Sequence, residues 1–558
     1  MSSLLDSKTL GPARQGFAEE KDLDEFVEKL GAFERGELAP EAWKQFRLIN
    51  GVYSQRQEGD AMMVRVKIPQ GLLTPAQLRA LAEVSDRYST GRGHITTRQN
   101  VQFHFVKLEQ TDDAVELLGA AGLTTREACG NAVRNVTTCP HAGASALEPF
   151  DSTPYAEAVT RHLLRGPLSS TLPRKFKIAF GGCCGFDCVG ASFNDLGFQA
   201  RMKDGQPGFR VTLGGGLATL RRAGILAHEF APAEEAVEIA EAIVRLFNRT
   251  GNRQQRHKAR LKFVIEKLGP DEFLRQYQAE RASGPRNPIE VLPVAPPRRP
   301  RHPQLRVTRP GLEAFARSNA RGQKDPDYVS VTVRVPLGDL STAQFRGLAA
   351  LAEELSEEQE VRMTVEQNLV MRFVKRGHLA SLHAALDALG LAASGAQTIS
   401  DVVSCPGAYS CRLAVTQSRG MAALLTGELK DRDDDLTIKI SGCPNGCGQH
   451  YVADIGLQGS VRKVNGRAVP QYHLYLGGGF GQESASFGRL AAKIPARKVA
   501  EAVRRLADFR AQGGELAKAP ALLLADLEEL PEASEEDYID LGETKSFEVR
   551  ISEGECAT

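Results

Sequence analysis

Hydrophobic and polar residues alternate along MMVRVKI and again along VSVTVRV, as expected for β-strands that bury one face. In each case a Pro-Gly-type turn follows, then an amphipathic helical pattern, a second strand and a second helix, over 62–123 and 329–391. The turn prolines Pro69 and Pro336 lie 267 residues apart. The pattern therefore predicts one small αβ unit that occurs twice.

The repeat continues downstream at an offset near 260 residues. The matching pairs are LPRKFKIAF (172–180) with LTIKISG (436–442), NDLGFQAR (194–201) with ADIGLQGS (453–460), LGGGL (213–217) with LGGGF (476–480), and PAEEAVEIAEAIVRLF (232–247) with PARKVAEAVRRLADF (495–509). Because separate blocks keep their order and spacing, we predict two homologous halves. Each half is expected to consist of a small αβ unit followed by a larger αβ unit.

Composition excludes several classes of function. The chain has 558 residues and a formal net charge of +1, so no chain-wide basic field for nucleic acid or membrane exists. No apolar run approaches the ~18 residues that span a bilayer, and no basic segment followed by an apolar core opens the sequence. We expect a cytoplasmic protein without nucleic-acid or membrane partners.

Two segments stand apart by composition. Residues 285–310 hold eight prolines and six arginines, which is typical of an extended linker. Residues 526–558 hold twelve acidic and two basic residues. This tail is expected to be a wrapped or mobile surface segment.

The ten cysteines carry most of the chemistry. In a reducing compartment they are not expected to form disulfides. Cys405-x5-Cys411 and Cys443-x3-Cys447 are two pairs separated by 31 residues, and four thiolates from two loops suit a metal centre. The spacing favours a [4Fe–4S] cluster. Structural zinc and four buried free thiols are the alternatives.

The first half repeats part of this pattern. Cys139 and Ser145 overlay the pair Cys405-x5-Cys411, and Cys184-x3-Cys188 resembles the second pair across a small gap. One of the four thiols is therefore replaced by a hydroxyl. We interpret these cysteines as a vestige of the duplication, with a second metal site as the alternative.

Cationic residues on strands of the first half suggest an anionic ligand. They are Arg65, Lys67, Arg98, Arg134, Lys175 and Lys177, with Arg253, Arg256, Arg260 and Lys262 further along. Each alone is readily explained as a solvated side chain. Together, on strands expected to be mostly buried, they need anions. The expected ligand is a polycarboxylate cofactor, an oxyanion substrate, or both.

TTRQNVQFH, LPRKFK, LGGGL and the Cys-x5-Cys…GCPNGC pattern together resemble the sulfite and nitrite reductase haemoproteins, over roughly residues 40–515. The resemblance implies an α+β fold, the internally duplicated (pseudo-twofold) sirohaem reductase fold, with mixed sheets, helices and ferredoxin-like half-domains. It also implies sirohaem coupled to a [4Fe–4S] cluster, and a six-electron reduction of sulfite to sulfide or of nitrite to ammonia.

The resemblance also implies roles for single residues. The cluster ligands are Cys405, Cys411, Cys443 and Cys447, of which Cys447 also ligates the sirohaem iron; the substrate cage is Arg65, Arg134, Lys175 and Lys177; and the sirohaem contacts are Arg98, His104, Arg260, Lys262 and Asn445. His94 stands where some members have arginine. Tyr53 and Cys129 stand where some bacterial members place a tyrosine and a cysteine near the sirohaem, and a covalent link between them is left open.

The repeat and the resemblance divide the chain into seven parts. They are an N-terminal extension (1–55), a first ferredoxin-like half-domain (56–125), a first sirohaem-binding domain with the substrate cage (126–284), a Pro/Arg-rich linker (285–320), a second ferredoxin-like half-domain (321–398), a second sirohaem- and cluster-binding domain (399–515) and an acidic tail (516–558). We expect a monomer.

Electrons must come from another protein, because no G-x-G-x-x-G strand–turn–helix or further ferredoxin-like cysteine run is present. Ferredoxin or a flavoprotein is the expected donor.

Lys175-x-Lys177 favours sulfite over nitrite, since a second lysine suits a doubly charged oxyanion. Nitrite reduction is the alternative. A non-catalytic electron carrier and a zinc-stabilised binding protein are further hypotheses, but neither needs an oxyanion pocket.

Overall fold

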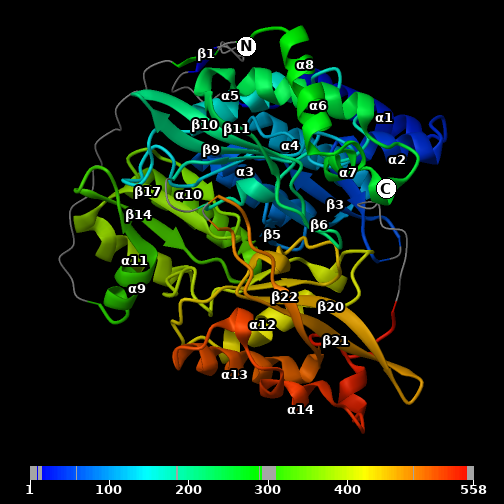
Figure 1. Cartoon of the computed structure of the whole chain (residues 1–558), viewed down its shortest axis with the longest axis vertical. Coiled ribbons are helices and arrows are strands. Elements are labelled where there is room, and N and C mark those ends of the chain that lie inside the picture. The colour runs from blue at the N-terminus through cyan, green and yellow to red at the C-terminus, as the bar shows by residue number, and fades with distance from the viewer. Residues whose placement is uncertain are drawn as a thin grey trace.

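The computed structural model describes residues 9–10, 16–57, 59–183, 187–287, 289–291, 309–481 and 483–549. Most of the predicted linker, Cys184 and Cys556 lie outside these ranges. The predicted duplication is confirmed: two smaller and two larger five-stranded sheets are present in the described chain, together with one two-stranded pair. Figure 1 shows the larger sheet of each half at opposite ends of the molecule.

The two smaller sheets exchange strands. The first has the order β15-β5-β6-β3-β2 and the second β13-β14-β17-β16-β4. Their strands are β2 (Val52–Ser54), β3 (Ala61–Val66), β4 (Leu72–Leu73), β5 (Arg92–Ile95), β6 (Val101–Lys107), β13 (Ala320–Gly322), β14 (Tyr328–Val333), β15 (Asp339–Ser341), β16 (Val361–Met363) and β17 (Leu369–Lys375). Strand β4 of the first half completes the second sheet, and β15 of the second half completes the first. Each half therefore depends on the other for an edge.

The helices that follow β4 and β15 begin at the same capping box. Helix α3 (Pro75–Tyr88) is capped by Thr74 with Gln77, and α10 (Thr342–Leu355) by Ser341 with Gln344. In each box the cap hydroxyl accepts from the glutamine N–H, while the glutamine side chain accepts from the cap N–H. Two unpaired donors are satisfied, and both helices start at equivalent points.

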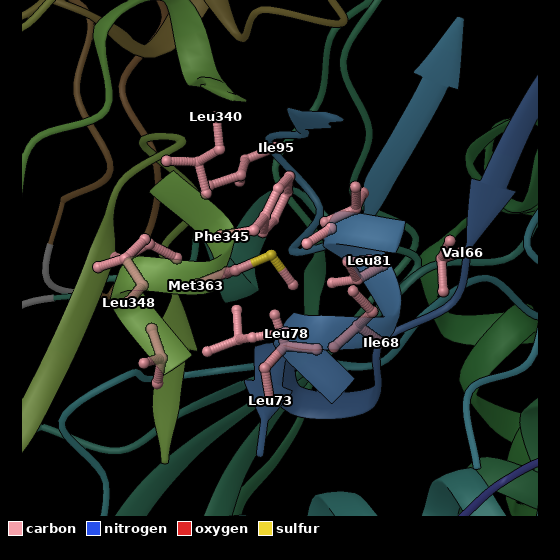
Figure 2. Packing of buried hydrophobic residues seen from close by; sticks show 14 of the residues in the cluster. Val66, Ile68, Leu73, Leu78, Leu81, Ile95, Leu340, Phe345, Leu348 and Met363 are labelled. Carbon is pink, nitrogen blue, oxygen red and sulfur yellow. The ribbon is translucent and has the colours of Figure 1, made fainter. Parts of the chain in front are cut away.

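Helices α3 and α10 pack together and close one shared core. Figure 2 shows Leu78 and Leu81 of α3 beside Phe345 of α10 and Met363 of β16. All four side chains are fully buried. Helices α4 (Thr111–Ala120) and α11 (Leu379–Ala388) complete the two units.

The two larger sheets have the same topology. Their orders are β11-β10-β9-β8-β7 and β18-β19-β20-β21-β22. The strands are β7 (Thr137–Thr138), β8 (Ile178–Gly181), β9 (Leu196–Lys203), β10 (Gln206–Leu213), β11 (Ile225–Pro232), β18 (Val403–Ser404), β19 (Ile438–Ser441), β20 (Ile455–Val464), β21 (Arg467–Leu476) and β22 (Arg489–Pro495). In each sheet the first three strands along the chain are parallel, and the remaining two are antiparallel.

The remaining helices pack against both the smaller and the larger sheets or against their helices. They are α1 (Glu20–Glu34), α2 (Pro40–Ile49), α5 (Thr153–Leu163), α6 (Ala236–Thr250), α7 (Leu261–Leu268), α8 (Pro270–Ser283), α9 (Leu312–Asn319), α12 (Ser418–Glu428), α13 (Val499–Ala511) and α14 (Ala525–Glu528), and β1 (Thr9–Leu10) pairs with β12 (Glu290–Val291). Among the described helices none is both long and apolar enough to cross a membrane.

The acidic tail, as far as residue 549, wraps onto the second larger sheet. Arg467 of β21 pairs with Glu535 at 2.7 Å, and its guanidinium lies over the ring of Tyr538. Asp540 is only 3% exposed. The tail is therefore held by specific contacts.

Two glutamines hold the seam between the small and large units. Gln99 and Gln367 both have positive φ, 52° and 66°. The amide nitrogen of Gln99 donates to the carbonyls of Thr138 and Met363, and its oxygen accepts from the Thr138 N–H. Gln367 likewise accepts from the Ser404 N–H. These turns fix the small sheets against the strands that lead into the cysteine loops.

Candidate active site

A cavity of about 1380 Å³, its open mouth included, lies where the four units meet. Six cationic side chains line it, namely Arg65, Arg98, Arg134, Lys175, Lys177 and Arg412. No Asp or Glu of the described residues is among the lining side chains. A cavity with this imbalance of charge fits a strongly anionic occupant.

The four predicted cluster cysteines all line one wall of this cavity. Cys405 comes directly after β18 and Cys443 shortly after β19, and these neighbouring strands are parallel. Their carboxyl ends therefore meet at one edge. The N–H of Gly442 points at the Cys405 sulfur, 3.3 Å away. Burial raises the pKa of Cys405, and the nearby Cys447 raises it further.

The arrangement fits a cluster better than a single zinc ion. Zinc draws its sulfur ligands to about 2.3 Å from one point. Paired zinc cysteines are usually separated by two to four residues, and the five residues between Cys405 and Cys411 are more than that. A cubic iron–sulfur cluster holds its four thiolates around its own larger body.

Lys175 and Lys177 enter the cavity together because side chains alternate along an extended segment. The Lys177 N–H donates to Asp195 at 2.9 Å, which fixes the backbone. Burial lowers the pKa of Lys177 well below its usual range, the guanidinium of Arg98 lowers it further, and Cys447 opposes the shift. An anion bound beside Lys177 would stabilise its charged form.

The two arginines of the predicted cage are held in place by the protein. Arg134 donates to the carbonyls of Ala128 and Gly130, at 3.2 and 2.8 Å. Arg65 donates to the Gln102 side chain at 3.1 Å. Both guanidinium groups line the cavity, so the structure brings all four predicted cage residues together.

Three predicted sirohaem contacts also line the cavity. Asn445 lies exposed in the cysteine loop. His104 is buried, which lowers its pKa to about 3, and its Nδ1 faces the Gln55 side chain at 3.1 Å. The Arg98 guanidinium donates to the Asn194 side chain and to a backbone carbonyl.

The other two predicted contacts, Arg260 and Lys262, are not among the lining residues. Arg260 pairs with Asp195 at 2.7 Å. The Lys262 ammonium donates to the carbonyls of Leu217 and Leu220. These residues support Lys177 and the LGGGL turn from behind. Their direct contact with a cofactor stays a prediction.

His94 also has its ring nitrogens engaged. Its Nδ1 lies 2.9 Å from an Asp339 oxygen, and its Nε2 lies 3.2 Å from the amide nitrogen of Gln367. Tyr53 and Cys129 are buried in one small apolar cluster with Met63. The link between them stays untested.

Sequence reasoning missed two residues that connect the halves. The Thr97 hydroxyl donates to the Cys447 carbonyl at 2.8 Å, and thereby joins the TTRQN turn to the cluster loop. The Arg412 guanidinium lines the cavity and donates to the Gln55 carbonyl. Only the position of Arg412 directly after Cys411 could have indicated its role.

A cationic cavity walled by four thiols is typical of an oxidoreductase that passes electrons to a bound anion. The family model of the nitrite and sulphite reductase 4Fe-4S domain matches residues 129–285 and 395–517. The model of the nitrite/sulfite reductase ferredoxin-like half domain matches 53–121 and 321–389. The chain therefore belongs to the nitrite and sulphite reductase family and is an oxidoreductase.

The chain is similar both to proteins named nitrite reductase and to proteins named sulfite reductase. A ferredoxin–nitrite reductase of Leptolyngbya laminosa is 32% identical, over 90% of this chain and 96% of that protein. A protein of Mycolicibacterium paratuberculosis named sulfite reductase (ferredoxin) 2 is 30% identical, over 84% of this chain and 86% of that protein. The solved structure of the Mycobacterium tuberculosis NirA protein matches with a TM-score of 0.75 and 27% identity, over 92% of this chain and 98% of that one.

The cofactors of the family, sirohaem and a [4Fe–4S] cluster, fit the residues present. Four thiols on one wall suit the cluster, and a cationic cavity without carboxylates suits a polycarboxylate macrocycle. The cluster would be held by Cys405, Cys411, Cys443 and Cys447, of which Cys447 is the most exposed. When bound, the two coupled groups supply electrons to the oxyanion.

Proposed function

We propose that this chain reduces sulfite to sulfide by six electrons, with ferredoxin as its electron donor. The observation that carries the proposal is the pair Lys175 and Lys177, which faces a cavity lined by no described carboxylate. Sulfite carries two negative charges and nitrite one, so a second lysine gains more from sulfite. Nitrite reduction is the second candidate, favoured by the similarity to a ferredoxin–nitrite reductase.

The chain's own residues would act in two ways. Arg65, Arg134, Lys175 and Lys177 would bind the oxyanion and stabilise charge that develops as each S–O bond breaks. Each oxygen leaves as water and needs two protons. The lowered pKa of Lys177 suits proton donation followed by reprotonation from solvent.

Ferredoxin is proposed as donor because relatives of both substrate types bear its name. The sequence contains no nucleotide-binding G-x-G-x-x-G strand–turn–helix, so the electrons come from a separate protein. One chain supplies both the cationic residues and the cysteines, which supports a monomer as the working unit.

The test compares kcat/KM for sulfite and for nitrite on one preparation with reduced ferredoxin. We expect at least a tenfold preference for sulfite, about 1.4 kcal/mol, that is lost in Lys177→Asn. The exposed Lys203, at the end of β9, provides the control Lys203→Asn, which should keep the preference. A wild-type enzyme that prefers nitrite would reverse the substrate assignment and leave the family intact.

A further inference from the structure

The first half contains a counterpart of the cluster site. Cys139 follows the last residue of β7, as Cys405 follows the last residue of β18. Cys183 lies two residues after the end of β8, as Cys443 lies two residues after the end of β19. Strand register therefore pairs Cys183 with Cys443, where the sequence overlay had chosen Cys184.

The downstream end of the loop gives the last pair. Gly190, with φ of 64°, precedes a short 3₁₀ turn, and Gln449, with φ of 63°, precedes the equivalent turn. Cys188 and Cys447 both lie two residues before these positions. The set Cys139, Ser145, Cys183 and Cys188 thus matches Cys405, Cys411, Cys443 and Cys447, with one extra residue in the first-half loop.

In this set three thiols lie against one another, and we call Cys139, Cys183 and Cys188 the thiol trio. The sulfurs of Cys139 and Cys183 are 3.8 Å apart, and the Cys183 sulfur is 3.5 Å from the Ser145 hydroxyl. Cys139 is fully buried and Cys183 is 6% exposed. Cys188 is partly exposed.

The trio favours one thiolate. Hydrogen bonds from Cys139, then Cys188, then the Ser145 hydroxyl lower the pKa of Cys183. The hydrogen bond with Cys183 and burial raise the pKa of Cys139, and the hydrogen bonds with Cys139 and Cys183 raise the pKa of Cys188. A thiolate is the nucleophilic form of cysteine, and two thiols beside it are ready to attack an oxidised sulfur. No described His, Cys, Asp or Glu triplet is arranged to hold a metal here.

We propose that the thiol trio is an oxidation site at which hydrogen peroxide converts Cys139 and Cys183 into a disulfide. The Cys183 thiolate attacks one peroxide oxygen, the O–O bond breaks, and hydroxide leaves and takes up a proton to become water. The sulfenic acid of Cys183 is then attacked by the Cys139 thiol. The S–S bond forms, and a second water leaves with the thiol proton. Two thiols and one peroxide give one disulfide and two waters.

The reaction requires only a small movement. The two sulfurs, now in van der Waals contact at 3.8 Å, must approach to about 2.05 Å. The loop that carries Cys139 is held from the second half, because Arg362 and Arg372 both donate to the Ala142 carbonyl. The disulfide would join the ends of β7 and β8 and leave the cluster cysteines unaltered.

The experiment treats the holoenzyme with one equivalent of hydrogen peroxide, alkylates remaining thiols under denaturing conditions and maps the peptides by mass spectrometry. We expect a Cys139–Cys183 cross-link two hydrogens lighter than the two thiols, reversed by dithiothreitol. Cys183→Ser should abolish it and Cys184→Ser should keep it. Ser145→Ala should slow its formation several-fold, because the hydroxyl that supports the thiolate is lost.

Two outcomes would overturn the proposal. One is full alkylation of both Cys139 and Cys183 in the wild-type enzyme after peroxide treatment, a result that does not depend on the folding of any variant. The other is one zinc or copper ion per chain that is absent from Cys183→Ser, which would make the trio a metal site.

Discussion

The two halves of the molecule share one strand topology but provide different functional residues: the first half provides the cationic cage and the second half the cluster cysteines. By strand register, the cage residues Arg65, Arg134, Lys175 and Lys177 correspond to Thr332, Ser400, Asp435 and Thr437 of the second half. The cluster cysteines of the second half correspond to three cysteines and a serine in the first. Each half therefore keeps the part that the other lacks, which shows that the fold provides positions and single residues decide their chemistry.

One pair of equivalent residues makes the difference concrete. The Lys177 N–H donates to Asp195 and the Thr437 N–H donates to Asp454, both at 2.9 Å. The Thr437 hydroxyl also donates to Asp454, so that side chain turns back to the backbone. The Lys177 side chain instead extends into the cavity. The same backbone contact thus presents a charge in one half and none in the other.

The largest expected effect separates the two cysteine sites. Cys443→Ser removes a cluster ligand, so reductase activity should fall by at least about a thousandfold, some 4 kcal/mol. Iron content should fall with it. The matched variant Cys183→Ser should keep both activity and iron. The measurements are iron per chain, the visible spectrum and the rate with reduced ferredoxin. Equal losses of activity and iron in the two variants would contradict the assignment of the cluster to the second half alone.

A second prediction concerns the hydrogen bonds by which Asp540 of the tail holds the segment next to the cluster loop. An Asp540 oxygen accepts from the Gln417 N–H at 2.7 Å, and the adjacent Ser418 donates to the Cys405 carbonyl at 2.8 Å. The equivalent loop of the first half is held differently: the Glu148 carboxylate accepts from the Gly143 N–H, and Arg362 and Arg372 of the second half donate to the Ala142 carbonyl. Burial raises the pKa of Asp540 to about 6. Between the unfolded value near 3.8 and 6, the native state therefore binds more protons than the unfolded state.

Because of this difference, the free energy of unfolding should fall as pH rises from 4 to 6, by about 2 kcal/mol from this group. Asp540→Asn should remove that part of the pH dependence. Urea unfolding followed by cluster absorbance at several pH values measures it. Glu532→Gln, which changes an exposed carboxylate of the tail, serves as control. Identical pH slopes for wild type and Asp540→Asn would show that Asp540 does not titrate in this range.

The third prediction tests the charge that only the first half provides. The lowered pKa of Lys177 means that its charge is lost at lower pH than for an ordinary lysine. kcat/KM for sulfite should therefore fall about tenfold per pH unit above that pKa. Lys177→Arg keeps its charge, so the alkaline decline should move to higher pH. Superimposable pH profiles would show that another group controls the decline.

Sequence alone predicted the duplication because its repeated blocks span strands and helices of several turns. It did not predict the exchange of β4 and β15, since strands of two or three residues carry no periodic signal. Because Cys183 and Cys184 are adjacent, the sequence alone could not decide which of them is equivalent to Cys443. The ends of β8 and β19 assign the equivalent position to Cys183. In the sequence, Arg260 and Lys262 cannot be distinguished from the cations that line the cavity. In the structure, Arg260 forms an ion pair with Asp195, and Lys262 donates to backbone carbonyls.

The smallest expected effect is that a fourth thiol in the first half leaves the iron content unchanged. Ser145→Cys gives the first half a fourth thiol, yet we expect no second cluster and no change in iron per chain. In the second half Gly407 has φ of 58°, and a Cβ there would lie 2.3 Å from the Ser418 hydroxyl. His141 holds the equivalent place in the first half and is buried. The first-half loop therefore cannot follow the same path closely.

The sulfurs of the first half are also in contact, at 3.8 Å, and leave no room for a cubic cluster between them. Iron and acid-labile sulfide per chain, measured on wild type and Ser145→Cys after identical reconstitution, decide the matter. A gain of about four irons per chain would mean that one hydroxyl alone separates the two loops. Unchanged iron would mean that the backbone around Gly407 and the length of the loop select the cluster as much as the thiols do.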